Sequence, residues 1–282
     1  MTDWFEETLY PHWQSRMRME RVLYDSKTDH QRLVLFEHNA FGRVLALDGV
    51  VQTTEKDEFI YHEMLAHAPI LAHGAARRVL IVGGGDGGML QEVLKHRGVE
   101  AVTMVEIDGG VVEFSKKYLS SICRDAFDDP RTDLVIADGV DFVAAGKGEY
   151  DVIIVDSTDP IGPGEVLFTE RFYQGCKRCL SPGGVLVTQN GVPYLQPEEL
   201  TRSVALWRPL FADAACYLAA VPTYVGGFMA LGWATDDTAL RSVPVETLEQ
   251  RFAAAGIETD YYTPAVHKAA FALPPYIGRL ID

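Results

Sequence analysis

The chain reads Val79-Leu-Ile-Val-Gly83-Gly-Gly-Asp86-Gly-Gly88 between residues 79 and 88. An apolar strand runs directly into glycines, which let the backbone approach a ligand closely at the N-terminus of the next helix. The spacing fits G-x-G-x-x-G, a pattern that serves dinucleotides and S-adenosyl ligands alike. It predicts a strand-loop-helix unit that binds a nucleoside, with a plain tight turn as the alternative.

The chain around this stretch alternates between strand and helix patterns. Candidate strands are residues 78–82, 101–106, 133–137, 151–156 and 185–189. Strands that alternate with helices indicate a doubly wound, mostly parallel α/β sheet with right-handed crossovers. The uncharged stretch 214–235 is broken by Pro222, Gly226 and Gly227. We therefore expect it to form two antiparallel strands joined by a turn, and not a membrane span.

Residues 1–53 have a different pattern, typical of a small antiparallel sheet. Asp48-Gly49 is a strong hairpin signal between two apolar runs. A small sheet that is apolar on both faces must pack on the main domain or on a second copy of the chain. From Thr54 a helical pattern begins, with an acidic first turn, and we expect this helix to end at Pro69. The predicted domains are thus 1–53, a β-sheet domain, and 54–282, a Rossmann-like catalytic domain.

Composition narrows the classes of partner. The 282 residues carry 25 Lys and Arg against 40 Asp and Glu, a formal charge of -15, and 48% are apolar. Nucleic acid and anionic membranes bind proteins through clustered Lys and Arg, so the excess of acids excludes both as main partners. Cationic ligands are favoured instead. The N-terminus lacks the features of a secretory signal peptide, and we expect a cytoplasmic protein. The four cysteines are Cys123, Cys176, Cys179 and Cys216, and we expect the closely spaced pair Cys176 and Cys179 to be half-buried thiols on a helix and not metal ligands.

Acidic residues follow four of the predicted strands. Ligands of such sheets bind beyond the carboxyl ends of the strands, so these acids should surround one crevice. They are Asp86, Glu106, Asp138, Asp156 and Asp159. Glu106 is suited to accept hydrogen bonds from both ribose hydroxyls of a nucleoside, or else it caps the next helix. Asp138, with Gly139 after it, can face a purine amino group or form a plain turn. Asp156 and Asp159 can point into one cavity, or form turns before Pro160.

Clustered acids repel each other unless a cation lies among them. Asp86 in the glycine loop would repel a pyrophosphate, and also the carboxylate of ordinary S-adenosylmethionine. Decarboxylated S-adenosylmethionine has a sulfonium, an ammonium and no acid. The residues therefore favour that nucleoside as the ligand.

The sequence resembles the spermidine synthases, particularly their bacterial branch, from about Tyr24 to the C-terminus. The resemblance rests on the segments Leu47-Asp-Gly-Val-Val-Gln-Thr-Thr-Glu-Lys-Asp-Glu-Phe59, Tyr61-His62-Glu63-Met64, Gly83-Gly-Gly-Asp86-Gly87, Val105-Glu-Ile-Asp108 and Asp156-Ser-Thr-Asp-Pro-Ile-Gly-Pro163. It implies a fold of the S-adenosylmethionine-methyltransferase type. It also implies an aminopropyltransferase that uses decarboxylated S-adenosylmethionine as co-substrate, with no cofactor and no metal, and that forms a homodimer or homotetramer.

The resemblance also assigns residues. It implies that the donor and the methylthioadenosine it becomes are held by Gln31, His62, Asp86, Glu106, Asp138, Gly139 and Pro163. It implies that the diamine is bound by Tyr61, His62, Asp86, Asp156, Asp159, Gln189 and Tyr224, with Asp156 as proton acceptor. His62 stands where other members have Gln, and we expect it to be neutral because a charged imidazolium would repel the sulfonium.

The implied reaction is an in-line attack of a putrescine amine on the propyl carbon next to sulfur, which gives spermidine and 5′-methylthioadenosine. An alkyl ammonium and an ordinary Asp differ by about 6.5 pKa units, or about 9 kcal/mol. We expect burial to lower the pKa of the amine, and crowding with Asp159 and Asp86 to raise that of Asp156. Alternatively, Asp156 mainly positions an amine that is already neutral. For the distal ammonium the candidates are Glu165, Glu6, Glu7 and Glu20.

Three other functions compete with this interpretation. A methyltransferase on the same fold would bind intact S-adenosylmethionine, which Asp86 disfavours. A non-catalytic polyamine-binding protein would not need the glycine loop or Glu106. A nicotinamide dehydrogenase would need a His or Lys at a hydride site beside the loop. The range of acceptors, from putrescine to cadaverine and longer amines, stays open because it depends on the length of the channel.

Overall fold

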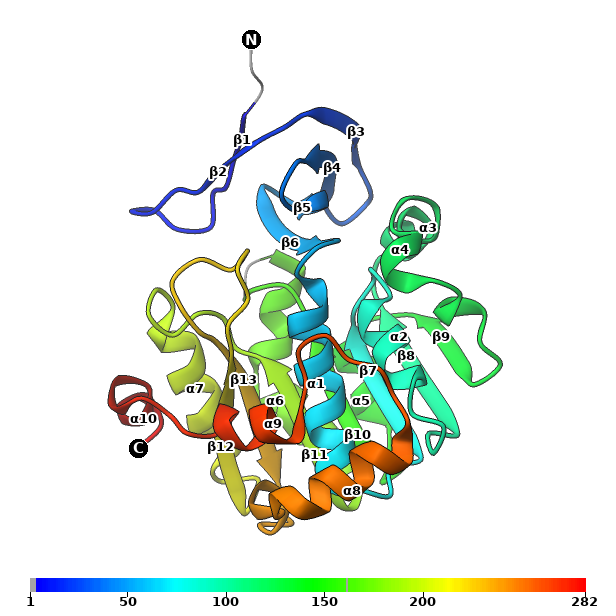
Figure 1. Cartoon of the computed structure of the whole chain (residues 1–282), viewed down its shortest axis with the longest axis vertical. Helices are drawn as coiled ribbons and strands as arrows, with labels where there is room; N and C mark the ends of the chain where they lie inside the picture. The colour runs from blue at the N-terminus through cyan, green and yellow to red at the C-terminus, as the bar shows by residue number, and fades with distance from the viewer. Residues whose placement is uncertain (1–3, 161) are drawn as a thin grey trace.

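The computed structural model describes residues 4–160 and 162–282, and the backbone but not the side chain of Pro163. Its central sheet has seven strands in the order β12-β13-β11-β10-β7-β8-β9 (Figure 1). The strands are β7 (Arg78–Gly83), β8 (Ala101–Glu106), β9 (Thr132–Ile136), β10 (Tyr150–Asp156), β11 (Leu180–Gln189), β12 (Asp213–Ala219) and β13 (Met229–Thr235). Strands β11, β10, β7, β8 and β9 are parallel, and β13 runs antiparallel to β11 and β12. The predicted doubly wound, mostly parallel sheet is confirmed.

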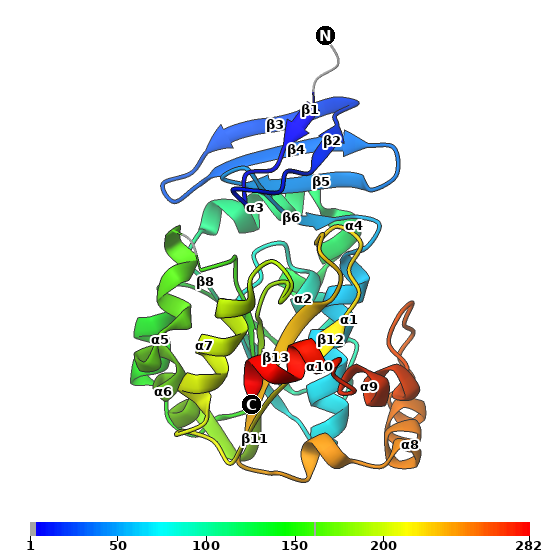
Figure 2. The ribbon, with the colours of Figure 1, turned by 90° about the vertical axis from the view of Figure 1, so that its left-hand side faces the viewer.

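The helices cover both faces of this sheet (Figure 2). They are α1 (Glu58–His73), α2 (Gly88–Leu94), α3 (Gly109–Tyr118), α4 (Ser120–Cys123), α5 (Gly139–Ala145), α6 (Glu170–Cys179), α7 (Pro197–Trp207), α8 (Val245–Ala255), α9 (Pro264–Ala270) and α10 (Pro275–Ile281). Short 3-10 turns are η1 (Ala126–Asp128), η2 (Gly162–Phe168) and η3 (Leu240–Ser242).

Strand β7 explains the two layers. Successive side chains of a strand point to opposite faces. Val79 and Ile81 join the core beneath α1, α2, α8 and α9. Leu80 and Val82 join the core beneath α5, α6, α7 and α10. An apolar run without alternation is therefore what a strand needs when both of its faces are buried.

The predicted strands of the sheet are all present, with bounds within a few residues except at the start of β11. The uncharged stretch forms β12 and β13, which pair antiparallel as expected. Among the described residues, no helix combines the length and the apolar character needed to cross a membrane.

The N-terminal region forms two small antiparallel sheets. One pairs β1 (Trp4–Glu6) with β2 (Arg16–Arg18), and the other contains β3 (Arg21–Lys27), β4 (Arg32–His38), β5 (Gly42–Leu47) and β6 (Val50–Thr54). Asp48 and Gly49 both have positive φ, as the tight hairpin between β5 and β6 requires. Leu35 and Leu45 pack against Phe114 of α3 and the following helix α4. The sheet thus packs on the main domain, while a domain boundary at residue 53 stays a prediction.

Both predicted ends of the first helix were wrong. Thr54 closes β6, and its hydroxyl donates to Asp57 Oδ1 at 2.6 Å, so the helix begins at Glu58. The helix also passes through Pro69 and ends at His73. A proline inside a helix costs about 3 kcal/mol. Here the helix is buried along most of its length, and that burial outweighs the loss of one backbone hydrogen bond.

The expected half-burial of Cys176 and Cys179 was also wrong. All four cysteines of the chain are free thiols and all four are buried. Cys176 and Cys179 lie on the inner side of α6 and belong to the core beneath that helix. Burial raises the pKa of both thiols, which keeps them protonated.

Candidate active site

A cavity of about 350 Å³ lies at the carboxyl end of the sheet. The strand order reverses between β7 and β10, which is where ligands bind in doubly wound sheets. The cavity is lined by eleven of the twelve predicted site residues: Gln31, Tyr61, His62, Asp86, Glu106, Asp138, Gly139, Asp156, Asp159, Gln189 and Tyr224. The predicted contact of the twelfth, Pro163, involves a side chain outside the described part of the chain.

The glycine loop holds the ends of β7 and β10 together. Gly83 has a φ of 88°, and a Cβ there would lie 2.1 Å from the carbonyl oxygen of Asp156. The Gly84 N–H donates to that same oxygen at 2.8 Å. Asp86 Oδ1 accepts a hydrogen bond from the Gly88 N–H at 2.9 Å. The loop therefore fixes Asp86 and Asp156 relative to each other.

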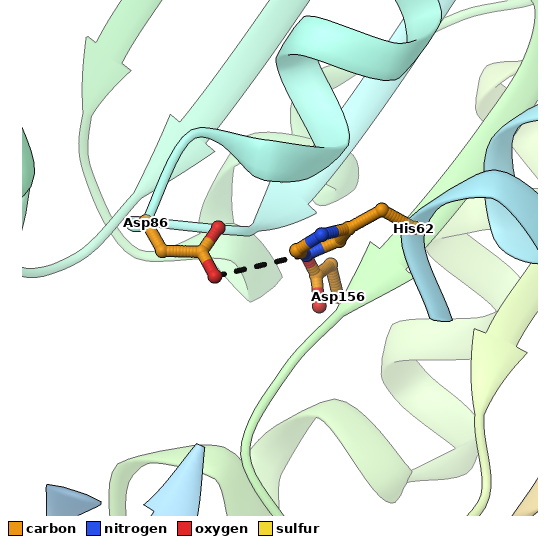
Figure 3. Close-up of side chains that lie close together, drawn as sticks. All are labelled: His62, Asp86 and Asp156. Atoms are coloured by element: carbon orange, nitrogen blue, oxygen red, sulfur yellow. Dashed lines mark ion pairs between the residues drawn. The ribbon is translucent and has the colours of Figure 1, made fainter. Parts of the chain in front are cut away.

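His62, Asp86 and Asp156 form a compact cluster at this end of the cavity, here called the reacting end (Figure 3). One ligand-type atom from each of the three lies within 4.8 Å of the others. His62 Nε2 is 3.7 Å from Asp86 Oδ2. The Tyr61 hydroxyl donates to Asp156 Oδ1 at 2.7 Å. Three chain segments, namely α1, the glycine loop and the end of β10, thus bring one imidazole and two carboxylates together.

Asp156 is a weaker acid than an ordinary aspartate. Burial, and next the charge of Asp86, raise its pKa to about 6, although His62 and the Tyr61 hydroxyl pull it down. The expected effect of Asp86 is confirmed. The expected effect of Asp159 was wrong, because Asp159 contacts a different set of residues.

The neutral state expected for His62 beside the sulfonium stays a prediction, whereas the cavity without ligand favours the charged form. Burial alone would lower the pKa of this histidine, but Asp86, Glu58 and Asp156 together raise it to about 10. Glu58 lies one turn earlier on α1, and its Oε2 is 2.5 Å from His62 Nδ1. An imidazolium has no lone pair for a metal, so this cluster is a poor metal site in that state. Sequence reasoning missed Glu58, although its i,i+4 spacing from His62 was a usable signal.

Glu106 and Asp138 lie where the nucleoside was predicted. Glu106 Oε1 accepts from the Asp108 N–H at 2.9 Å, and burial raises the pKa of the carboxyl to about 7. The next helix is capped by Asp108 and not by Glu106. Asp138 is the N-cap of α5, since its Oδ1 accepts from the Val140 N–H at 2.7 Å. Each acid uses one oxygen in the fold and keeps one for a ligand.

Gly139 and Gln31 complete this side of the cavity. A Cβ at Gly139 would lie 2.6 Å from Val82 Cγ1, so only glycine lets α5 pack this closely on β7. Gln31 Nε2 donates to Asp108 Oδ2 at 3.2 Å, which links the N-terminal sheet to the end of β8.

Asp159 belongs to a second polar group, here called the distal end. Its Oδ1 accepts from Gln196 Nε2 at 3.1 Å, and Gln196 Oε1 accepts from the Tyr10 hydroxyl at 3.0 Å. Burial, and next the charge of Glu7, raise the pKa of Asp159. Sequence reasoning missed Tyr10 and Gln196, which come from chain segments far apart in sequence.

Gln189 and Tyr224 lie on the walls of the cavity. Gln189 donates to the carbonyl of Thr158 at 3.2 Å and accepts from the Gly191 N–H at 2.8 Å. The ring of Tyr224 stands edge-on to Tyr61, with centroids 6.0 Å apart. Both side chains are therefore held in place by neighbours before any ligand arrives.

The four acids named for a distal ammonium differ in position. Glu7 lines the cavity, and its two oxygens accept from the Val51 N–H at 3.0 Å and the Ser15 hydroxyl at 2.7 Å. The other three do not line it: Glu6 pairs with Arg16, Glu20 pairs with Arg18, and Glu165 is exposed.

Comparison with known proteins gives one consistent answer. Residues 58–243 match the model of the spermine/spermidine synthase domain, and residues 3–55 that of the spermidine synthase tetramerisation domain. A polyamine aminopropyltransferase of Ruegeria sp. is 62% identical, over 98% of each chain. Polyamine aminopropyltransferase 1 of Pseudomonas aeruginosa is 59% identical, over 98% of this chain and 97% of the relative.

Solved structures agree. A spermidine synthase crystallised with the transition-state analogue AdoDATO superposes with a TM-score of 0.93 at 40% identity, covering 99% of this chain and 94% of that one. The spermidine synthase of Thermotoga maritima gives a TM-score of 0.90 at 38% identity, with the same coverage. The chain belongs to the spermine/spermidine synthase family.

Proposed function

We propose that this chain transfers the aminopropyl group of decarboxylated S-adenosylmethionine to putrescine, giving spermidine and 5′-methylthioadenosine. The observation that carries the proposal is the charge of the cavity. Acids occupy both its reacting end and its distal end, and no Lys or Arg is found among the described residues that line it. The sulfonium and ammonium of the donor and the two ammonium groups of putrescine suit such a cavity, whereas the carboxylate of intact S-adenosylmethionine would face Asp86.

The donor occupies the side of the cavity near β8 and α5. Glu106 accepts hydrogen bonds from the ribose, and Asp138 with Gly139 faces the adenine. Gln31 completes this pocket. The free oxygens of Glu106 and Asp138 support these roles, because each carboxylate has only one oxygen used by the fold.

The diamine lies between the reacting end and the distal end. Its reacting ammonium binds Asp156, beside Tyr61 and Asp86, and its other ammonium binds Asp159 and Glu7. Gln189 and Tyr224 form the walls between them. The grouping of Asp159 with Glu7, apart from Asp156, supports two separate ammonium sites.

The reaction needs a neutral amine. The amine lone pair then forms the C–N bond while the C–S bond breaks, and its electron pair moves to sulfur. With a pKa of about 6, Asp156 is closer to an alkyl ammonium than an ordinary aspartate is. The remaining difference is about 4.4 pKa units, or about 6 kcal/mol. Asp156 therefore binds and orients the ammonium, and this difference is large for a direct proton transfer to its carboxylate. The transfer needs no cofactor and no metal, because the sulfonium is already an activated leaving group.

We also propose a homodimer or homotetramer in the cytoplasm. The match of residues 3–55 to a tetramerisation domain supports an oligomer. Trp4, Trp13 and Val22 of the N-terminal region are exposed apolar side chains, as an interface requires. Light scattering on the purified chain distinguishes the two assemblies.

A product assay tests the function. The chain is incubated with decarboxylated S-adenosylmethionine and, separately, putrescine, cadaverine and spermidine. We expect spermidine and methylthioadenosine in equal amounts from putrescine. Absence of product with every amine contradicts the transferase. Tighter calorimetric binding of intact S-adenosylmethionine than of the decarboxylated form would favour a methyltransferase, and diamine binding without nucleoside binding would favour a polyamine-binding protein.

A further inference from the structure

His62 is the basic group of the reacting end. Its side chain is 2% exposed, and its two ring nitrogens face different acids. Nδ1 lies 2.5 Å from Glu58 Oε2, and Nε2 lies 3.7 Å from Asp86 Oδ2. A ring held by a carboxylate on one side, with its other nitrogen in a reactive cavity, has the arrangement of a general base and its orienting partner.

The groups that face this imidazole come from three elements. Helix α1 contributes Glu58 and the Tyr61 phenol, the glycine loop contributes Asp86, and β10 contributes Asp156. A protonated His62 therefore neutralises part of the charge of three carboxylates when the cavity is empty. This accounts for the raised pKa of the imidazole.

The donor brings a fixed positive charge into the same cavity. Two cations at short separation in a buried site repel each other strongly. The sulfonium cannot lose its charge, but the imidazolium can lose a proton. The proton on Nε2 can leave, because this nitrogen faces Asp86, whose side chain is 13% exposed to solvent. Nδ1 keeps its proton and donates it to Glu58 Oε2.

We propose that His62, oriented by Glu58, exchanges its proton for the positive charge of the donor and then accepts the proton of the diamine. Binding of decarboxylated S-adenosylmethionine releases one proton from His62 to solvent. The neutral Nε2 then takes one proton from the ammonium held at Asp156. The amine attacks the propyl carbon, the C–S bond breaks, and the product leaves as a secondary ammonium with His62 protonated again.

This cycle balances. One proton leaves the protein when the donor binds, and the diamine proton restores the starting state of His62. The overall reaction converts two dications, the donor and putrescine, into neutral methylthioadenosine, the spermidine trication and one free proton. The total charge is therefore the same on both sides, and one proton is released, as in the cycle. In this cycle the final proton acceptor is His62, and Asp156 holds the ammonium. The cycle rests on the proposed function, and it adds His62 as the group that carries the proton and Glu58 as the group that orients the imidazole.

Calorimetry in buffers of different ionisation heat counts the released protons. At pH 8, Asp156 and Glu106 are already ionised, since their pKa values are about 6 and 7. We therefore expect close to one proton released per site when decarboxylated S-adenosylmethionine binds. Uncharged methylthioadenosine, which fills the same nucleoside pocket, should release close to none. Equal proton counts for the two ligands would overturn the proposal.

Two variants locate the proton. His62→Gln keeps a hydrogen-bonding side chain without a titrating group, and it should bind the donor with no proton release. His12→Gln makes the same change at an exposed histidine outside the cavity and should behave as the wild type. Between pH 7.5 and 9, donor affinity should rise about tenfold per pH unit in the wild type and stay flat in His62→Gln. The same proton release in His62→Gln as in the wild type would rule out His62 as the source.

Nitrogen-15 NMR of histidine-labelled wild-type protein provides a readout that needs no variant. The His62 ring should change from its charged to its neutral form when the donor is added, and a ring that stays charged would contradict the cycle. The product assay keeps this result separate from the function. Spermidine formation without proton release refutes the cycle alone, whereas absence of spermidine refutes the proposed function.

Discussion

Removal of the Tyr61 hydroxyl tests how the reacting end sets the acidity of Asp156. In the structure this hydroxyl donates to Asp156 Oδ1 at 2.7 Å, and the bond favours the ionised carboxylate. A hydrogen bond to a charged group contributes about 1.5–3 kcal/mol, which corresponds to about 1–2 pKa units. Tyr61→Phe keeps the ring and should therefore raise the pKa of Asp156 by that amount.

The direction of the shift in the pH profile follows from the charge of Asp156. Asp156 must be ionised to hold the ammonium of the diamine, so activity falls as pH drops through its pKa. In Tyr61→Phe the acidic limb of kcat/KM for putrescine, measured at saturating donor, should lie about 1–2 pH units higher than in the wild type. Above that limb the variant should recover most of the wild-type rate.

Tyr150→Phe is the matched control. Tyr150 lies at the opposite end of β10 from Asp156, and its hydroxyl donates to Thr103 Oγ1 at 3.3 Å. The Tyr150→Phe variant also loses one side-chain hydrogen bond in the same sheet, yet its pH profile should match that of the wild type. An unchanged acidic limb in Tyr61→Phe, with a rate loss that is equal at every pH, would refute the tuning of Asp156 by Tyr61.

Three further variants probe the rest of the cavity. Asp156→Asn should lower kcat by about 10²–10⁴-fold while donor affinity changes far less. Single-turnover kinetics measure the rate, and calorimetry measures the donor affinity. Near wild-type turnover would show that Asp156 has no role in the reaction. Gly88→Ala puts a Cβ 2.3 Å from the His62 ring. It should therefore lower the free energy of unfolding by about 1–3 kcal/mol and raise the donor KM. Gly98→Ala is the control, because a Cβ there has nothing within 4 Å, and it should change neither quantity. Glu7→Gln should raise the putrescine KM about tenfold, because a charged contact is lost. In the control Glu6→Gln the putrescine KM should match the wild type. Equal KM values for the two variants would exclude Glu7 from the distal end.

The strand ends were predictable because two signals coincide there. Apolar runs such as Val79 to Val82 define a strand buried on both faces, and an acid after such a run can only lie at the carboxyl edge of the sheet. The parallel order of the strands then brings Asp86, Glu106 and Asp156 to one cavity. Each of these steps uses local pattern and topology, both of which are written in the sequence.

The division of the cavity into two ends was not predictable in this way. Asp156 and Asp159 are three residues apart, and sequence reasoning placed them in mutual repulsion. In the structure Asp159 is held by Gln196, which follows β11, while Asp156 faces His62 from α1. Which acids share a neighbourhood depends on how distant segments pack, and no spacing along the chain encodes that.

The choice of histidine at position 62 follows from the charge of its surroundings. A Lys or Arg there would neutralise part of the charge of Glu58, Asp86 and Asp156 permanently, and it would repel the sulfonium. A Gln would leave the three carboxylates unneutralised in the empty cavity. Histidine is the side chain that carries a positive charge when the cavity is empty and gives it up when a cation arrives. The acids of the cavity thus attract cationic substrates, and the titrating imidazole among them gives up its own charge so that those substrates can bind.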